Sequence, residues 1–341
     1  MKFSLDWLGD FVDTAAAGGP EGVRRLLEQA GIPLETMERA GSDVIFDFEI
    51  TPNRPDAMSH RGLAREIAAM AGLSIKAPSA AEPAASGAKV DELASVTIEV
   101  PRLCRRFGAR VVRGIGTGPA SERVRARLSA IGAKSISAAV DATNYVLWEI
   151  GQPLHAFDLD KLAGGRVIVR RARKGEKLVL LDGVEYTLSS SDVVVADAER
   201  AVSLAGIMGG LETAVGPETK NVLLEAAWWD PASIRRTSRR LGLHTDASHR
   251  FERGADFEST VLSCDLVAQM ILQSGGGELI GDVVDVVSKR MEQAPVVLRV
   301  AEVRRILGGN LDAGQIFRLL KRLGFTLIPE GQDDEQFSVQ I

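Results

Sequence analysis

Residues 76–95 constrain the fold of this chain most, because they contain almost nothing that a hydrophobic core could bury. The segment reads KAPSAAEPAASGAKVDELAS and is dominated by Ala, Pro, Ser and Gly, a composition typical of a linker. The chain has 341 residues, which is more than one ordinary core accommodates. We therefore expect a multidomain α+β protein, with a small N-terminal α+β unit at residues 1–75 and a larger unit after the linker.

Composition and charge exclude several classes of protein. Hydrophobic residues make up 45% of the chain and no apolar run is long enough to span a bilayer, so we expect no membrane role. The N-terminus carries acids within its apolar residues, unlike a secretory signal. Cys104 and Cys264 have no partner nearby in sequence, which favours a reducing cytoplasm and argues against a bound metal. With a net charge of −5, contacts with nucleic acid depend on local basic clusters.

Helix and strand signals alternate in the N-terminal unit. Residues 21–30 predict a helix, and residues 44–50 predict a strand that ends at the proline-rich TPNRP. Ser59 precedes an amphipathic stretch at residues 60–70 and predicts an N-cap. His60 falls in the first turn of that helix, where we expect a solvated side chain rather than a ligand.

Residues 96–290 read as a large β-rich central unit, and residues 293–341 read as a partial α/β unit whose last strand looks unfinished. Period-two alternation marks the strands, and caps and 3.6-residue periodicity mark the helices. The expected strands are 96–100, 110–113, 166–171, 177–181, 192–196, 222–229, 296–300, 325–328 and 337–341. The expected helices are 122–131, 231–241, 259–274, 302–307 and 312–323.

The stretch DATNYVLWEIGQPLHAFD, Asp141–Asp158, combines short polar side chains with an apolar run. We expect a turn at its start, because Asp141, Thr143 and Asn144 can bond nearby backbone. His155 lies between apolar neighbours, so its imidazole should be partly buried and need a partner. Two interpretations are open, a pocket residue or a structural histidine bonded to a loop carbonyl, and spacing alone favours the second.

Two further segments carry unusual residues. Ser203–Gly210 is rich in glycine, which lets backbone pass close to a ligand or to another strand, although its spacing matches no nucleotide-binding fingerprint. Glu225 lies within the apolar strand 222–229, where an unpaired charge costs several kcal/mol. The glutamate therefore either bonds a polar group or faces water at a strand edge, and both interpretations remain open.

Arginines cluster on two of the expected helices. Those of helix 122–131, including Arg127, are expected to face solvent. The helix that starts at Asp230-Pro231 has a denser cluster, which can contact RNA phosphates, although a solvated face is equally compatible. These RNA-contact candidates are Arg235, Arg236, Arg239 and Arg240. The segment that follows, residues 244–254, mixes polar groups around Ala247 and suits a pocket wall.

Five motifs together resemble the β subunits of bacterial phenylalanyl-tRNA synthetases, in the order and approximate spacing of that family. They are ITPNRPDAMSHRGLAREIAA, DATNYVLWEIGQPLHAFD, LAGIMGG, NVLLEAAWWDPASIRRTSRRLGL and TDASHRFERG. The resemblance covers nearly the whole chain and implies a B1-like N-terminal unit, a B3/B4-like editing domain and a partial B5-like unit. The family's OB-fold tRNA-binding insert is absent, because Ala40-Gly41 leads directly into the strand at residues 44–50.

The resemblance also implies a function. In this family an α subunit, joined to β in an α2β2 heterotetramer, charges tRNA(Phe) with phenylalanine using ATP and Mg²⁺. The central β domain hydrolyses mischarged tyrosyl-tRNA(Phe). We thus expect a synthetase subunit in the cytoplasm, with the α subunit and tRNA(Phe) as partners and no cofactor in this chain itself.

Site residues follow from the same resemblance. The editing positions fall on His155, Glu225 and Thr143 as catalytic residues, with Asn144, Gly206, Gly209, Thr245, Ala247 and Lys134 as substrate-binding residues. The glutamate and the imidazole would bond the tyrosine hydroxyl, and such a site rejects an analogue without that hydroxyl by about 10⁴-fold. Asn144 and the Gly206 region would hold the amino group while a positioned water hydrolyses the ester. We therefore expect Glu225 and His155 to line one cavity.

One departure from the family and two alternative functions complete these expectations. Where the family often has RPINN, this chain has KSISA at Lys134–Ala138, which removes a guanidinium and two amides near the tRNA end. One alternative is a freestanding deacylase that edits in trans, but such proteins usually lack the first and last units. The other is a non-catalytic RNA-binding or assembly scaffold, against which the intact pocket residues weigh.

Overall fold

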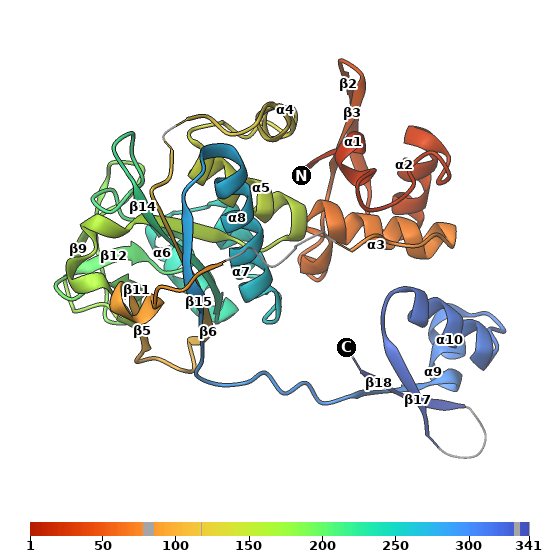
Figure 1. Ribbon diagram of the computed structural model, residues 1–341. Helices are drawn as coiled ribbons and strands as arrows, with labels where there is room; N and C mark the ends of the chain where they lie inside the picture. The colour runs from red at the N-terminus through yellow and green to blue at the C-terminus, as the bar shows by residue number, and fades with distance from the viewer. Residues whose placement is uncertain (78–84, 117, 331–334, 341) are drawn as a thin grey trace.

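A three-stranded antiparallel sheet and three helices form the N-terminal unit in the computed structural model of the chain (Figure 1). The structure describes residues 1–77, 85–116, 118–330 and 335–340. The bounds are Lys2–Ser4 for β1, Leu5–Leu8 for α1, Gly19–Gln29 for α2, Leu34–Ala40 for β2, Asp43–Phe48 for β3, Pro55–Ala57 for the 3₁₀ turn η1 and His60–Ala71 for α3. The Ser59 cap is confirmed, since its hydroxyl accepts from the Gly62 N–H. Strand β2 was not expected, because its mostly exposed side chains show no alternation.

Two five-stranded sheets face each other in the central unit, which confirms the α+β class. One sheet has the order β4-β15-β6-β14-β7 and the other β13-β12-β11-β8-β5. Their bounds are Ala85–Ser86 for β4, Ser95–Ile98 for β5, Cys104–Arg113 for β6, Leu154–Asp158 for β7, Arg166–Arg171 for β8, Val193–Ala196 for β11, Ala201–Leu204 for β12, Met208–Gly209 for β13, Asn221–Trp229 for β14 and Glu278–Val287 for β15. A separate hairpin pairs β9 (Lys177–Val179) with β10 (Glu185–Thr187).

Among the helices of the central unit, α5 and α8 cover the outer face of the first sheet. The bounds are Glu122–Ala130 for α4, Ala138–Ile150 for α5, Pro231–Leu241 for α6, Asp246–Phe251 for α7 and Ser259–Gly275 for α8, with 3₁₀ turns at Leu159–Lys161 and Ala163–Gly165. From β14, Val222 and Leu224 pack on this side with α8, while Leu223 and Trp229 point into the core between the sheets. The predicted caps of α6 are confirmed, because Asp230 accepts from the Ser233 N–H and Gly242 ends the helix at a positive φ.

The turn expected at Asp141 is wrong, because the residue lies inside α5. Ser137 caps this helix, and both Asp141 carboxylate oxygens bond the preceding loop instead of starting a turn. Val140, Thr143, Asn144 and Leu147, spaced as neighbours on one helical face, line a common cavity. The spacing of these four residues is helical, but the short polar side chains among them favoured a turn in the prediction.

The linker prediction for residues 76–95 is wrong in its second half. Residues 78–84 lie outside the described part of the chain, but β4 pairs in parallel with β15. A 3₁₀ turn follows at Val90–Glu92, where Val90 is buried, as is Ala94. Both join the core between the two sheets, so the central unit begins before residue 96.

A second three-stranded sheet, with the order β16-β18-β17, carries two helices near the end of the chain (Figure 1). The bounds are Val296–Arg299 for β16, Val300–Leu307 for α9, Ala313–Arg322 for α10, Thr326–Pro329 for β17 and Gln336–Gln340 for β18. Ile341, expected to end the last strand, lies outside the described residues. Within the described ranges, no helix combines the length and the apolar character that crossing a bilayer requires.

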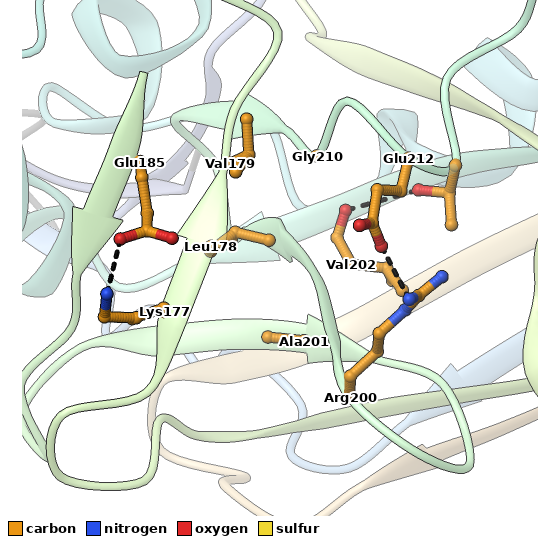
Figure 2. A pocket seen from close by; sticks show the side chains of 10 residues that line it. Lys177, Leu178, Val179, Glu185, Arg200, Ala201, Val202, Gly210 and Glu212 are labelled. Carbon is orange, nitrogen blue, oxygen red and sulfur yellow. Dashed lines mark hydrogen bonds and ion pairs between the residues drawn. The ribbon is translucent and has the colours of Figure 1, made fainter. Parts of the chain in front are cut away.

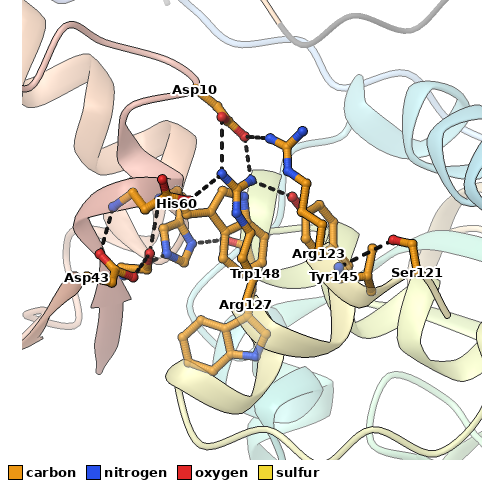
Figure 3. Close-up of polar contacts among 12 residues, drawn as sticks. Asp10, Asp43, His60, Ser121, Arg123, Arg127, Tyr145 and Trp148 are labelled. Atoms are coloured by element: carbon orange, nitrogen blue, oxygen red, sulfur yellow. Dashed lines mark hydrogen bonds and ion pairs between the residues drawn. The ribbon is translucent and has the colours of Figure 1, made fainter. Parts of the chain in front are cut away.

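His60 is fully buried, so the expectation of a solvated side chain is wrong. Figure 3 shows its imidazole between the N-terminal unit and α5. The Ser4 N–H donates to Nε2 at 3.1 Å, and Nδ1 therefore carries the proton that it donates to the Trp148 carbonyl at 2.9 Å. That carbonyl lies in the last turn of α5, where no backbone donor within the helix reaches it. Burial lowers the pKa of His60 to about 3, so the ring stays neutral.

Arg127 is also buried rather than solvated. Its guanidinium bonds Asp6, Asp10 and the Tyr145 hydroxyl, with the Asp6 contact at 2.9 Å and the tyrosine contact at 2.8 Å (Figure 3). Around it, apolar side chains of α4 and α5 belong to the same buried cluster as α1 and α3. The N-terminal unit and these two helices therefore share one core.

Replacing His60 by alanine should destabilise the protein, because the Ser4 N–H and the Trp148 carbonyl would lose their partner while staying buried. We expect a loss of about 3 kcal/mol in the free energy of unfolding, measured by urea denaturation. His244→Ala is the matched control, since His244 is exposed. Equal unfolding free energies for the two variants would contradict the bridging role of His60.

Candidate functional site

A cavity of about 420 Å³ opens between the two central sheets. Its walls come from β7, β13, β14, α5, and the start of α7. Eight of the candidate site residues line it: Thr143, Asn144, His155, Gly206, Gly209, Glu225, Thr245 and Ala247. The other candidates do not, since Lys134 is exposed on the loop before α5 and the four arginines lie on the exposed face of α6.

Glu225 and His155 are direct neighbours across the β14–β7 ladder. Both point into the space between the sheets, as do Leu223 and Phe157 on the same strands. The imidazole Nε2 and the carboxylate Oε2 are buried and have no hydrogen-bond partner among the described residues. His155 is thus a pocket residue rather than one bonded to a loop carbonyl. Glu225 lies on an inner strand, so the strand-edge interpretation is wrong, and no described residue provides the polar partner of the other interpretation.

Burial shifts the ionisation of both groups toward their neutral forms. It raises the pKa of Glu225 to about 8 and lowers the pKa of His155 to about 4. Near pH 7 the cavity therefore presents mainly a neutral carboxylic acid beside a neutral imidazole. Such a pair can donate a hydrogen bond to a hydroxyl group and accept one from it, without bringing a charge into the cavity.

Two glycines shape the wall that faces His155. A Cβ atom on Gly209 would lie 2.2 Å from His155 Cε1, so only glycine leaves room for the imidazole. Gly206 adopts a φ of +67°, and a Cβ there would lie 2.8 Å from atoms of Trp229 and Ile234. The glycine-rich segment thus brings its backbone against the cavity, as its composition predicted.

The remaining polar groups of the cavity differ in whether their hydrogen-bonding atoms already have partners. The Thr143 hydroxyl donates to the Val140 carbonyl at 2.7 Å, which leaves it lone pairs for accepting a hydrogen bond. The Thr245 hydroxyl donates to the Ile207 carbonyl at 2.8 Å and caps α7, so it holds the wall together. The half-buried Asn144 amide has no partner among the described residues and is free to bind a polar group.

A second, smaller hollow offers weaker chemistry. Figure 2 shows a hollow of about 210 Å³ beside β9, in which Lys177 pairs with Glu185 at 2.7 Å and Arg200 with Glu212 at 2.6 Å, so these charges neutralise each other. Both cysteines are buried free thiols. Across the described residues, no three or more His, Cys, Asp or Glu side chains are grouped to hold a metal ion.

Several residues that the sequence did not indicate also line the cavity between the central sheets. Ile136 and Leu181 reach it from two loops, and Trp229 and Phe251 add aromatic walls. Ile136 lies in the segment where the chain departs from the resembled family, so attention to that segment could have identified it. No local pattern marks Leu181, because the hairpin that carries it is placed by contacts with Gly209 and Gly210, which lie far along the chain.

Comparison with known proteins identifies relatives along most of the chain. A family model described as B3/4 domain matches residues 103–276. The phenylalanine–tRNA ligase β subunit of Geobacter metallireducens is 46% identical over 84% of this chain and 36% of its own length. That of Moorella thermoacetica is 43% identical over 97% of this chain and 41% of its own length. The chain therefore spans less than half the length of these curated relatives.

A solved structure also aligns with the chain. It is an N-terminal fragment of the phenylalanyl-tRNA synthetase β-subunit from Pyrococcus horikoshii, with 16% sequence identity. The alignment covers 99% of this chain and 93% of the fragment, and its TM-score is 0.45.

The stability of the protein should depend on the ionisation of Glu225. Because its pKa is about 8 in the folded protein and near 4.5 in the unfolded chain, the unfolded chain loses the proton first. The free energy of unfolding should therefore fall between pH 6.5 and pH 8, and less so in Glu225→Gln. Denaturation at several pH values measures how steeply the free energy of unfolding falls with pH in the wild-type protein and in Glu225→Gln. The exposed Glu218→Gln should keep the wild-type slope, and a wild-type slope in Glu225→Gln would refute the shifted pKa.

Enlarging Gly209 should disturb the cavity directly. In Gly209→Ala the new methyl group meets the imidazole of His155, and we expect a loss of about 2 kcal/mol in the free energy of unfolding. Gly216→Ala is the control, because no atom lies within 4 Å of a Cβ there. The histidine NMR signals report the displacement of His155. If they stay unchanged in Gly209→Ala, the close packing is wrong.

Proposed function

Because this chain belongs to the family of phenylalanine–tRNA ligase β subunits and contains a B3/4 domain, we propose that it works as part of such a subunit. In this role it associates with an α subunit as an α2β2 heterotetramer, binds tRNA(Phe) and supports its charging with phenylalanine in the cytoplasm. ATP and Mg²⁺ serve the charging reaction of the complete synthetase. The described residues provide no cluster of three or more metal ligands.

The cavity between the central sheets supports a second activity, the hydrolysis of tyrosyl-tRNA(Phe). The observation that carries this proposal is the buried, unpartnered pair of Glu225 and His155 facing one cavity. Leaving such groups without a partner costs free energy in the empty protein. A ligand hydroxyl that bonds both groups removes this cost.

Tyrosine and phenylalanine differ by one hydroxyl group, which is what this pair would recognise. The neutral carboxylic acid of Glu225 can donate to the phenol oxygen, and the unprotonated nitrogen of His155 can accept the phenol proton. Phenylalanine would leave both groups buried and unpaired. Sites of this kind discriminate by about 10⁴-fold or more, so correctly charged tRNA would escape hydrolysis.

The reaction needs a water molecule but no protein nucleophile. We assign the free amide of Asn144 and the backbone at Gly206 to the substrate amino group. The lone pairs of Thr143 can accept a hydrogen bond from the attacking water. The water oxygen adds to the ester carbonyl carbon, and the bond from this carbon to the ribose oxygen then breaks. The ribose oxygen takes up the proton that the attacking water gives up, and tyrosine and tRNA leave.

Basic side chains outside the cavity would hold the RNA. Arg235, Arg236 and Arg239 are exposed on α6, which follows directly from the cavity strand β14. Arg240 in the same cluster pairs with Asp192 and is less available. Exposed Lys134 lies on the loop before α5, beside the cavity residue Ile136. Such contacts are independent of sequence and weaken with salt.

Deacylation of tyrosyl-tRNA(Phe) by the complete synthetase tests the editing proposal. We expect Glu225→Ala and His155→Ala each to lower the rate by about 100-fold, since each removes a hydrogen bond to the phenol and leaves its neighbour unpaired. The exposed Glu218→Ala serves as the control. Undiminished rates in both cavity variants would refute editing at this site.

The same assay separates the alternative functions. Deacylation at the full rate without an α subunit would favour a freestanding deacylase. Binding of tRNA without any deacylation by the wild-type protein would favour a scaffold with a decayed pocket.

A further inference from the structure

The mouth of the cavity carries two exposed aliphatic side chains. Among the large hydrophobic side chains that are exposed in the described residues, two line this cavity: Ile136, which is 70% exposed, and Leu181, which is 46% exposed. Apolar surface left in water is unfavourable until something covers it. When exposed apolar side chains lie at the rim of a cavity whose base is polar, part of a ligand is expected to lie against them.

Ile136 is held in this exposed position. The buried carboxylate of Asp141 accepts from the Ile136 N–H at 2.7 Å and from the Ser135 hydroxyl at 2.5 Å. The next residue, Ser137, caps α5. The loop is therefore ordered before any ligand arrives, which lowers the entropy lost on binding.

Leu181 is fixed to the same wall from another direction. Its N–H donates to the Gly209 carbonyl at 3.0 Å, and Gly209 packs directly against the imidazole of His155. The hairpin that carries Leu181 is also held by the pairing of Leu180 with Gly210. The two rim side chains thus come from separate elements, each anchored to a cavity wall.

We propose that Ile136 and Leu181 form a subsite for the base of the tRNA's terminal adenosine, an inference that rests on the proposed function. With the phenol bonded by Glu225 and His155 inside the cavity, the ester and the ribose must lie toward the mouth. The attached purine then reaches the rim. The face of the purine is apolar, so covering the aliphatic side chains is favourable in free energy, while the polar edge of the purine stays in water.

Binding of two stable tyrosine derivatives to the full chain tests this subsite. One is tyrosine methylamide, which occupies the cavity alone. The other is 3′-deoxy-3′-(tyrosylamido)adenosine, in which an amide replaces the ester and the nucleoside is retained. Calorimetry gives the ratio of the two affinities. We expect the nucleoside derivative to bind at least tenfold more tightly to the wild-type protein, and Ile136→Ser or Leu181→Ser to remove most of this gain.

Ile306→Ser is the matched control, because Ile306 is 67% exposed but lies on α9, outside the cavity. It should keep the wild-type ratio. Equal affinities of the wild-type protein for both compounds, or an unchanged ratio in both rim variants, would overturn the subsite and leave the proposed function intact. If neither compound binds the wild-type protein, the proposed function fails and the subsite fails with it.

Discussion

The pairing of β14 with β7 is the constraint on which the rest of the candidate site depends. This register places Glu225 opposite His155 on the face that points toward the second sheet. Neither buried group finds a partner among the described residues, so both stay neutral at a cost in free energy. Burial of the extensive apolar core around them offsets this cost in free energy. The Glu225–His155 pair is therefore a polar, desolvated spot within the cavity. Such a spot suits the recognition of a single hydroxyl group.

Helix α5 connects this cavity to the rest of the molecule through three faces. One face carries Thr143 and Asn144 into the cavity, and a second packs Val146 against the first central sheet. The third packs Tyr145 and Trp148 into the core of the N-terminal unit. Buried Arg250 adds a second link, since it donates to the Met58 carbonyl and to Asp246 on the cavity wall. The N-terminal unit thus supports two walls of the cavity.

Three wrong predictions, for His60, for Arg127 and for the segment after residue 84, share one cause. His60 and Arg127 were expected in solvent because each lies near the start or on the polar face of a helix, yet contacts with distant residues bury them. The segment after residue 84 has a linker composition, but β15 recruits it as a neighbouring strand. In each case the local composition favours the expected state, and a partner far away in sequence overrides it.

The sequence alone determined the local structure, because caps, proline positions and apolar periodicity act within a few residues. Ser59, Asp230 and the apolar run of β14 show this. Sequence motifs also indicated the family and the composition of the site. The tertiary structure alone decided that Glu225 and His155, far apart in the chain, meet with their polar atoms unpaired. It also decided that Ile136 stays exposed at the mouth. Strand register and long-range packing set these features, and no local pattern encodes them.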